Sequence, residues 1–217
     1  MGQKVNPTGF RTGNFLPWKS RWFTDNKNIS KYLIEDIKIR NHLMKKLRPG
    51  GVTSVEIERL PKSMVITVTV SRPGVVIGRG GTGITDTKKE VLSIIRKMRK
   101  KPIKNLKIDM KVNEVKNPEL SAQLVASRIV DELQRRIPHR RVIARTMDRV
   151  MSSGALGVKI ILSGRIGGAE ISRREKYHRG SVPTQTLRKN IDYAETPALL
   201  KRGYVGVKVF IHKKEED

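Results

Sequence analysis

The glycine-rich stretch at residues 73–84, PGVVIGRGGTGI, is the first segment whose residue types could bind a ligand. It places Gly78, Arg79, Gly80 and Gly81 between two apolar runs. Glycines let a backbone come close to an anion, and a lone arginine adds a positive charge, so this stretch predicts a phosphate-binding loop. The phosphate could belong to a mononucleotide, a dinucleotide cofactor or a nucleic acid.

The residues around this loop argue against a nucleotide-binding enzyme. Residues 78–83 match Gly-x-Gly-x-x-Gly, but a dinucleotide site also needs an acidic residue about 20 positions later. The window between Glu90 and Asp109 holds no acid, and no lysine between Arg72 and Lys88 could complete an NTPase-type loop. The four histidines are scattered and cysteine is absent. We therefore expect no enzyme, no cofactor and no metal site.

The same stretch fits the Gly-x-x-Gly loop of a KH domain, which clamps the backbone of a single-stranded nucleic acid. Isoleucines bracket the loop, a short helical turn at residues 74–77 precedes it, and a long helix follows it. The start of that helix offers unpaired N–H groups and a partial positive charge to a phosphate. The bases would lie over an apolar groove floored by the preceding strand, with Val68 and Val70 as candidates.

The overall charge predicts a polyanionic partner. The 217-residue chain carries 46 Lys and Arg against 20 Asp and Glu, a formal net charge of +26. Nucleic acid is the leading partner because each neutralised phosphate releases a counterion. An anionic membrane is the rival, but no apolar run approaches the ~20 residues of a membrane span, and the N-terminus lacks a signal-peptide core. We expect a cytoplasmic protein with no membrane partner.

Three further stretches concentrate positive charge. Residues 96–107 hold seven basic residues and no acid, residues 134–149 are rich in arginine, and residues 163–189 combine basic residues with glycines. Charge runs are often solvated faces, but a run with few acids favours binding of an anion. The predicted RNA-binding residues are Gly78, Arg79, Gly80, Gly81, Arg96, Lys97, Lys100, Lys101, Arg135, Arg136, Arg140, Arg141, Arg145, Arg165, Arg173, Arg174, Lys176 and Arg179.

Hydrophobic periodicity predicts the elements that position the glycine loop. A first helix is predicted from Ile29, because Leu33, Ile37, Met44 and Leu47 recur at helical spacing. Two alternating strands, the loop with its short helical turn, a long helix and a third strand follow. The order helix–strand–strand–helix–helix–strand is typical of a type II KH domain.

A second domain is predicted to begin near Asn117, which suits a helix N-cap. Two helices and then several strands follow, so the fold class is α+β, with two helices packed on a mainly antiparallel sheet. In the second of these helices Arg141, Arg145 and Arg149 are spaced by four and would share one face. The expected domains are an extended N-terminal arm at residues 1–27, a type II KH domain at 28–115 and a C-terminal α+β domain at 116–217.

Five stretches resemble bacterial small-subunit ribosomal protein three, in order and over nearly the whole chain. They are the opening MGQKVNPTGFRTG, the loop RPGVVIGRGG, the joint VKNPELSAQLVA, the segment SGRIGGAEISRREKYHRGSVPTQTLR and the ending YVGVKVFI. The resemblance implies a type II KH domain, a family-specific C-terminal domain and a place in the small ribosomal subunit. It also implies binding to the small-subunit (16S) rRNA in the head.

The resemblance further implies protein neighbours and contact with mRNA. The neighbours would be ribosomal proteins ten and fourteen in the head, and proteins four and five around the mRNA entry channel. In the family pattern, two adjacent arginines and a lysine three places after the second hold incoming mRNA. The arginines correspond to Arg140 and Arg141, whereas Ala144 stands at the lysine position. Arg145 would substitute for the lysine, although on a helix it points about 100° away.

A free-standing KH regulator of mRNA is the alternative function. It predicts that Gly80→Asp abolishes RNA binding, because a carboxylate would lie against phosphate. A ribosomal protein would lose only part of its binding, because its charges are spread over both domains.

Overall fold

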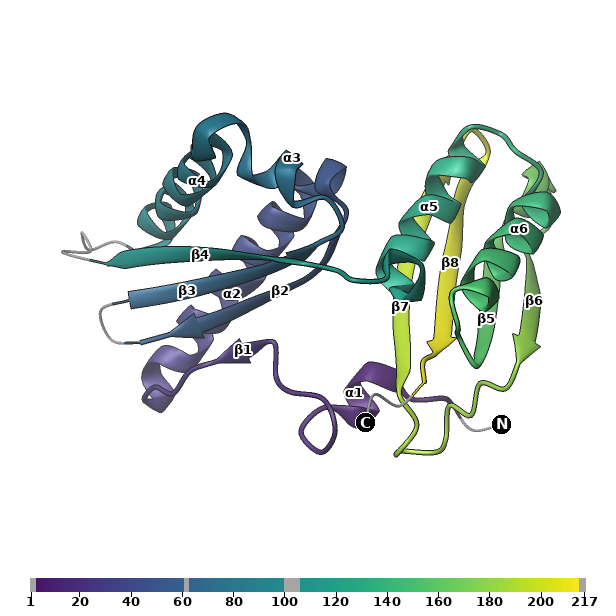
Figure 1. The fold of residues 1–217 in the computed structure, drawn as a ribbon, viewed down its shortest axis with the longest axis horizontal. Helices are drawn as coiled ribbons and strands as arrows, with labels where there is room; N and C mark the ends of the chain where they lie inside the picture. Colours follow the sequence, from purple (N-terminus) through teal and green to yellow (C-terminus); the bar gives the residue numbers. More distant parts are fainter. Residues whose placement is uncertain (1–2, 61–62, 100–105, 215–217) are drawn as a thin grey trace. The chain divides into compact units, whose positions relative to one another are not determined.

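A computed structural model describes residues 3–60, 63–99 and 106–214 of the chain (Figure 1). The chain forms two compact units. One is Trp18–Lys116, and the other combines Met1–Pro17 with Asn117–Asp217. No helix of the described residues is long and apolar enough to cross a membrane.

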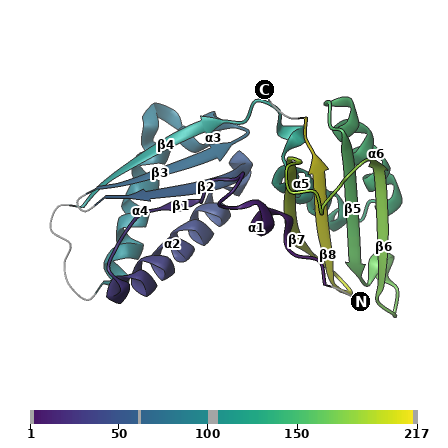
Figure 2. The ribbon, with the colours of Figure 1, turned by 90° about the horizontal axis from the view of Figure 1, so that it is seen from below.

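The unit Trp18–Lys116 has the element order of a type II KH domain. Its elements are β1 (Ser20–Arg21), α2 (Asn26–Lys46), β2 (Val52–Arg59), β3 (Ser63–Val70), α3 (Pro73–Ile77), α4 (Thr82–Met98) and β4 (Lys107–Glu114). The sheet runs β1-β2-β3-β4, with β2 antiparallel to β3 and β4 parallel to β3. Helices α2 and α4 contact each other and lie side by side on one face of the sheet (Figure 2). The predicted KH fold is confirmed.

The core of this unit confirms the predicted strands and shows which face of α2 is buried. Alternate residues of β3 are almost fully buried, as the period-two pattern predicts. In α2, Leu33 and Ile37 are 49% and 45% exposed, whereas Glu35 and Asp36 are buried beside Ile39. The apolar spacing thus predicts the helix correctly, but Ile29, Leu33 and Ile37 do not lie on its buried face.

A network of buried ion pairs explains the orientation of α2. Arg59 donates through Nη1 to Glu35 Oε2 at 2.7 Å and through Nε to Asp36 Oδ1 at 2.8 Å, and its Nη2 also contacts Asp36 Oδ1. Arg99 donates through Nε to Glu35 Oε1 at 2.6 Å, and Trp22 Nε1 donates to Asp36 Oδ2 at 2.7 Å. Buried carboxylates need such partners, so the two acids turn α2 toward the cations of β2 and α4.

The second unit is the predicted layer of two helices on an antiparallel sheet. Its elements are α1 (Pro7–Arg11), α5 (Ala122–Gln134), α6 (His139–Ser152), β5 (Gly157–Gly164), β6 (Arg173–Gly180), β7 (Ile191–Leu200) and β8 (Gly203–His212). The strand order is β6-β5-β8-β7, and every pair is antiparallel. Helix α5 packs on β7 and β8, and α6 packs on β5 and β6 (Figure 1). Val205, Val207, Val209 and Ile211 share one face of β8, which is buried against these helices.

The residues predicted as an extended arm divide between the two units. Helix α1 contacts β7, while β1 adds a strand beside β2 of the KH unit. The guanidinium of Arg11 is buried and donates to the backbone oxygens of Thr184, Thr186 and Lys189. This arginine ties the N-terminal segment to the loop before β7.

Candidate nucleic-acid interface

The glycine loop lies between α3 and α4 and includes the short 3₁₀ turn η2 (Arg79–Gly81). Gly80 has a φ of 61° with open space where a Cβ would lie, so the conformation rather than crowding requires glycine. Gly83 differs, because a Cβ there would lie 2.5 Å from the carbonyl oxygen of Val76. The start of α4 therefore packs directly on the backbone of α3, and Arg79 stays exposed at the turn.

The start of α4 is suited to an anion. Gly81 is its N-cap, and no side chain among the described residues caps this end of the helix. The first N–H groups of a helix lack intrahelical partners, and the helix dipole adds a partial positive charge. Backbone donors and the guanidinium of Arg79 thus meet at one exposed turn, which is the chemistry of a phosphate contact.

The structure corrects the predicted floor of the base-binding groove. Val68 and Val70 are both 0% exposed and belong to the core under α2 and α4. They face the helices rather than solvent, because alternate residues of β3 point to opposite sides of the sheet. No base could reach them without opening the core.

The basic run after the loop has mixed roles. Arg96 and Lys97 are exposed in the last turn of α4, roughly 20 Å from the glycine loop by the helical rise. Lys100 and Lys101 lie outside the described residues. Arg99 belongs to the internal network with Glu35, so this run also supplies a cation to the fold.

Helix α6 separates apolar and basic side chains onto opposite faces. Val142, Ile143 and Val150 are buried against the sheet, while the basic residues point to solvent. The exposed basic residues of α6 are Arg140, Arg141, Arg145 and Arg149. The predicted sharing of one face by arginines spaced by four holds in the structure.

Strand β6 continues this basic face at an edge of the sheet. Of the described strands only β5 pairs with β6, so its other edge keeps backbone groups available. Arg179 of β6 forms an ion pair with Asp148 of α6, which joins the two elements. We call this region the α6–β6 surface, and its residues are Arg140, Arg141, Arg145, Arg149, Arg173 and Arg179. Arg174 and Lys176 are also exposed, but they alternate with these residues and lie on the face of the sheet away from α6.

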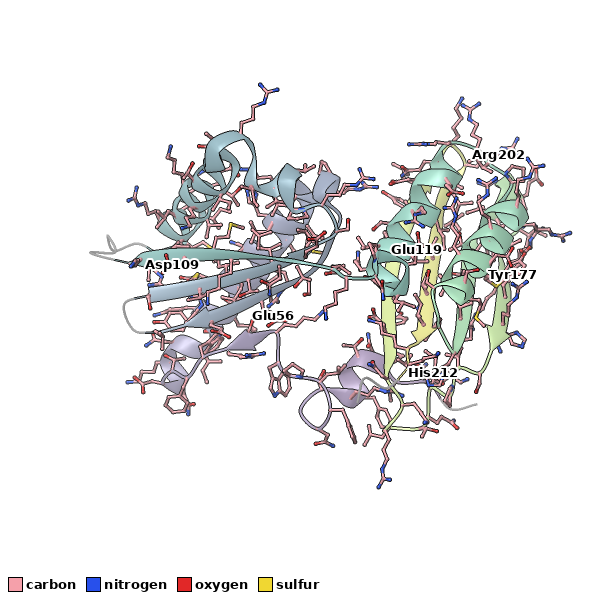
Figure 3. The ribbon with its side chains drawn as sticks, viewed as in Figure 1. Glu56, Asp109, Glu119, Tyr177, Arg202 and His212 are labelled. Atoms are coloured by element: carbon pink, nitrogen blue, oxygen red, sulfur yellow. The ribbon has the colours of Figure 1, made fainter. Side chains whose placement is uncertain are left out.

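A carboxylate at the centre of β6 orders part of this surface. Glu175 accepts hydrogen bonds from the Tyr177 hydroxyl at 2.5 Å and from Arg173 Nε at 2.7 Å. The Tyr177 bond, followed by Arg173, holds the pKa of Glu175 below its ordinary value. Burial raises the pKa of Tyr177, and its bond to Glu175 adds to that, whereas nearby Arg140 acts in the opposite direction. Glu175 therefore stays ionised and positions both Arg173 and Tyr177. Figure 3 labels Tyr177 beside α6.

The exposed side of α6 bounds a shallow depression of about 700 Å³. Arg141, Ala144 and Arg145 line it, with Glu119 at its rim. Glu119 is paired with Arg128, whose Nη1 lies 2.6 Å from its carboxylate. The carboxylate is thus already neutralised, and the arginines of α6 remain available to an anionic strand.

The remaining predicted residues gather at the start of α6. Arg135 and Arg136 are exposed in the turn between α5 and α6. Arg165 follows β5 and is partly buried, and its Nε donates to the carbonyl oxygen of Ala169 at 2.9 Å. The structure brings Arg136 and Arg165 to one cavity, described below, and adds Arg202. In the described residues no group of three or more His, Cys, Asp and Glu could hold a metal ion.

Comparison with known proteins identifies the family. Residues 129–211 match the family described as Ribosomal protein S3, C-terminal domain, and residues 38–120 match the KH domain. Small ribosomal subunit protein uS3 of Caldicellulosiruptor saccharolyticus is 44% identical over 213 residues, which cover 98% of this chain and 92% of that protein. The uS3 protein of Clostridium novyi is 44% identical over 215 residues, which cover 99% and 94%.

The chain belongs to the uS3 family. It is thus a structural protein of the small ribosomal subunit with an RNA-binding KH domain. The resemblance seen in five sequence stretches is confirmed.

Two exposed basic residues of this uS3 chain were not predicted as RNA-binding. Lys201 and Arg202 were passed over, although a basic pair directly before Gly203 in a hairpin turn is a readable signal of exposed cations. Trp18 and Phe23 do not pin the N-terminal segment to the core, because they are 64% and 97% exposed. Only Trp22 does so, through its bond to Asp36.

Proposed function

We propose that this chain binds the small-subunit rRNA in the head of the subunit and holds mRNA at the entry channel. The observation that carries the proposal is the α6–β6 surface. It presents exposed cations from two neighbouring elements, and the carboxylates within it, Asp148 and Glu175, are already paired. Such a surface gains free energy from a phosphate backbone by releasing counterions.

The two units would contribute to RNA binding in different ways. The glycine loop would hold a phosphate with backbone N–H groups and Arg79, at one position of the strand. The α6–β6 surface would follow a longer stretch of backbone with dispersed guanidinium groups. Loss of either contact would weaken binding without abolishing it.

The arginines of α6 would face the mRNA. Arg140 and Arg141 stand at the family positions, and Ala144 leaves a gap between them and Arg145. Arg141 and Arg145 line the same depression as Ala144, so Arg145 can take part in holding a strand despite its different direction. Support of this kind is passive and electrostatic, and translocation would supply the work of opening an mRNA duplex.

Protein neighbours would contact the apolar side of α2. Ile29, Leu33 and Ile37 follow one another at helical spacing and are each at least 40% exposed. An exposed stripe of this kind favours a protein contact over RNA. We assign ribosomal proteins ten and fourteen as neighbours in the head, and proteins four and five as neighbours around the mRNA entry.

The mRNA assignment is tested with small subunits that carry Arg140→Ala/Arg141→Ala. We expect these ribosomes to stall longer at a stable mRNA hairpin while they translate unstructured mRNA at the normal rate. Subunits with Lys31→Ala/Lys38→Ala, which remove the same charge from exposed residues of α2, are the matched control. Equal passage of the hairpin by the α6 variant and wild type would overturn the assignment.

A further inference from the structure

A cavity of about 710 Å³ lies where three turns of the C-terminal unit meet. They are the turn between α5 and α6, the 3₁₀ turn η4 (Ile166–Gly168) and the hairpin between β7 and β8. Leu133, Ile137 and Leu200 form part of an apolar wall, and Arg136, Arg165 and Arg202 supply positive charge. None of the described residues that line the cavity is acidic. The site therefore combines an apolar surface with unopposed cations.

Two of these cations are held in place by backbone oxygens. Arg202 Nη1 donates to the carbonyl oxygen of Gly168 at 2.7 Å, and Arg165 Nε donates to that of Ala169 at 2.9 Å. A Cβ at Gly168 would come within 3.0 Å of Arg202 Cδ, so the glycine makes room for the arginine. Each bond uses one of five guanidinium N–H groups, which leaves donors for a ligand.

The third cation occupies a strained backbone position. Arg136 has a φ of 62°, and among the described residues it is the only non-glycine residue with a positive φ. The N–H of Arg136 bonds to the oxygen of Leu133, and the N–H of Ile137 bonds to that of Glu132. This is the helix ending in which glycine is the usual residue, so arginine stands here at a conformational cost. A side chain kept under strain at the mouth of a charged cavity points to binding.

The cavity adjoins the α6–β6 surface. His139 lines it, and the next residue of α6 is Arg140. His139 Nε2 lies 3.1 Å from Glu175 Oε2, but the angle is outside that of a hydrogen bond, so this buried nitrogen has no hydrogen-bond partner among the described residues. The cavity and the basic face of α6 therefore meet at the start of this helix.

We propose that this cavity receives one unpaired nucleotide of an RNA strand bound along the α6–β6 surface. The base lies against the apolar wall, and its phosphate lies among Arg136, Arg165 and Arg202. The volume suits a ligand of that size, and a paired base could not enter because it would have to leave its stack. The inference rests on the proposed RNA binding and adds to it a pocket that selects unpaired nucleotides.

The test compares two RNA hairpins that differ in one bulged nucleotide, which carries a base in one RNA and is abasic in the other. Binding to the purified full-length chain is measured by fluorescence anisotropy at fixed salt. We expect the RNA with the base to bind about tenfold tighter. Equal affinities would overturn the cavity assignment, whereas absence of binding to both RNAs would overturn the proposed RNA binding itself.

Two variants locate the preference for the base in the cavity. Arg136→Gly should reduce the ratio of the two affinities to below threefold while the protein keeps or gains stability, because glycine suits the backbone. Leu199→Glu places a carboxylate at the cavity from a residue that is already 57% exposed, and it should also remove the preference. Tyr204→Glu, opposite Leu199 on the same hairpin and outside the cavity lining, is the control that should keep it.

A competition experiment distinguishes binding of a nucleotide within an RNA strand from binding of a free nucleotide. AMP at millimolar concentration should not displace the bulged RNA, because it lacks the phosphates that the α6–β6 surface binds. Displacement by micromolar AMP, or an unchanged affinity ratio in both cavity variants, would contradict the proposal.

Discussion

Helices α2 and α6 each have one buried and one exposed face, but the side chains on these faces differ. Helix α6 buries Val142 and Ile143 and exposes arginines. Helix α2 buries Glu35 and Asp36 with its apolar residues and exposes Leu33. In α6 the exposed arginines have few protein partners and are available to RNA, whereas in α2 the two buried carboxylates bind cations inside the fold. Charge on a helix therefore indicates RNA binding only where the fold leaves it unpaired.

The largest expected effect concerns the buried charges of α2. Arg59→Ala would leave Glu35 and Asp36 buried without their main partner, and breaking such a pair costs about 3–5 kcal/mol. Arg59 is 6% exposed in its side chain, so water cannot replace the lost contacts. We expect urea denaturation to show a loss of this size.

Arg21→Ala is the control for that loss. Arg21 pairs with Glu56 at 3.6 Å and with Glu58 at 3.2 Å, but its side chain is 49% exposed. An exposed pair contributes about 0–1 kcal/mol. If Arg59→Ala cost no more than Arg21→Ala, the buried network would not be what orients α2.

A smaller effect should appear when the pH is lowered. Burial raises the pKa of Glu35, but the hydrogen bonds from Arg99 and Arg59 more than offset this, so its pKa is lowered in the folded protein. The stabilisation is therefore complete above the unfolded pKa of about 4.3 and is lost as the pH falls through the lower folded value. We expect the free energy of unfolding to fall in this acidic window.

Glu35→Gln isolates the contribution of that carboxylate. The variant should be less stable than wild type at pH 7, and its free energy of unfolding should change less as the pH falls below about 4.3. Thermal or urea unfolding at several pH values measures both. An identical pH dependence in the variant and wild type would contradict the role assigned to Glu35.

The smallest effect on stability is expected on the exposed side of α2. Leu33→Ser should change the free energy of unfolding by less than about 0.5 kcal/mol, because surface substitutions rarely exceed this. Leu43→Ala, on the buried side, should cost about 2–5 kcal/mol. Denaturation curves of the two variants decide which face of α2 is buried. A larger loss from Leu33→Ser than from Leu43→Ala would reverse the assignment of the faces.

The sequence predicted the elements that depend on local pattern. The alternation in β3 and β8, the glycine loop before α4 and the basic face of α6 can all be predicted from the spacing of residues in the sequence. Each of these features depends on neighbours along the chain. The buried face of α2 cannot be predicted in this way, because Glu35 and Asp36 are held by Arg59 and Arg99, which lie far away in sequence. The same holds for Arg11, whose backbone partners lie more than 170 residues later.

The candidate site was predictable to a similar extent. The residues of α6 and β6 were identified by composition, but the groove floor at Val68 and Val70 was wrong because an alternating strand does not say which side is covered. The cavity could not be predicted, since three separate turns bring Arg136, Arg165 and Arg202 together. Only the fold places them at one site.

The most direct test of this account compares a charge reversal in α6 with an equal charge reversal in α2. Arg141→Glu/Arg145→Glu/Arg149→Glu in α6 and Lys31→Glu/Lys38→Glu/Lys45→Glu in α2 change exposed residues and lower the net charge equally. RNA affinity of the full-length chain is measured over a range of salt. The account predicts that only the α6 variant lowers the slope of log affinity against log salt, by about two for three lost single-strand phosphate contacts. Equal losses in both variants would mean that RNA responds to net charge alone, which would contradict the α6–β6 surface as the binding site.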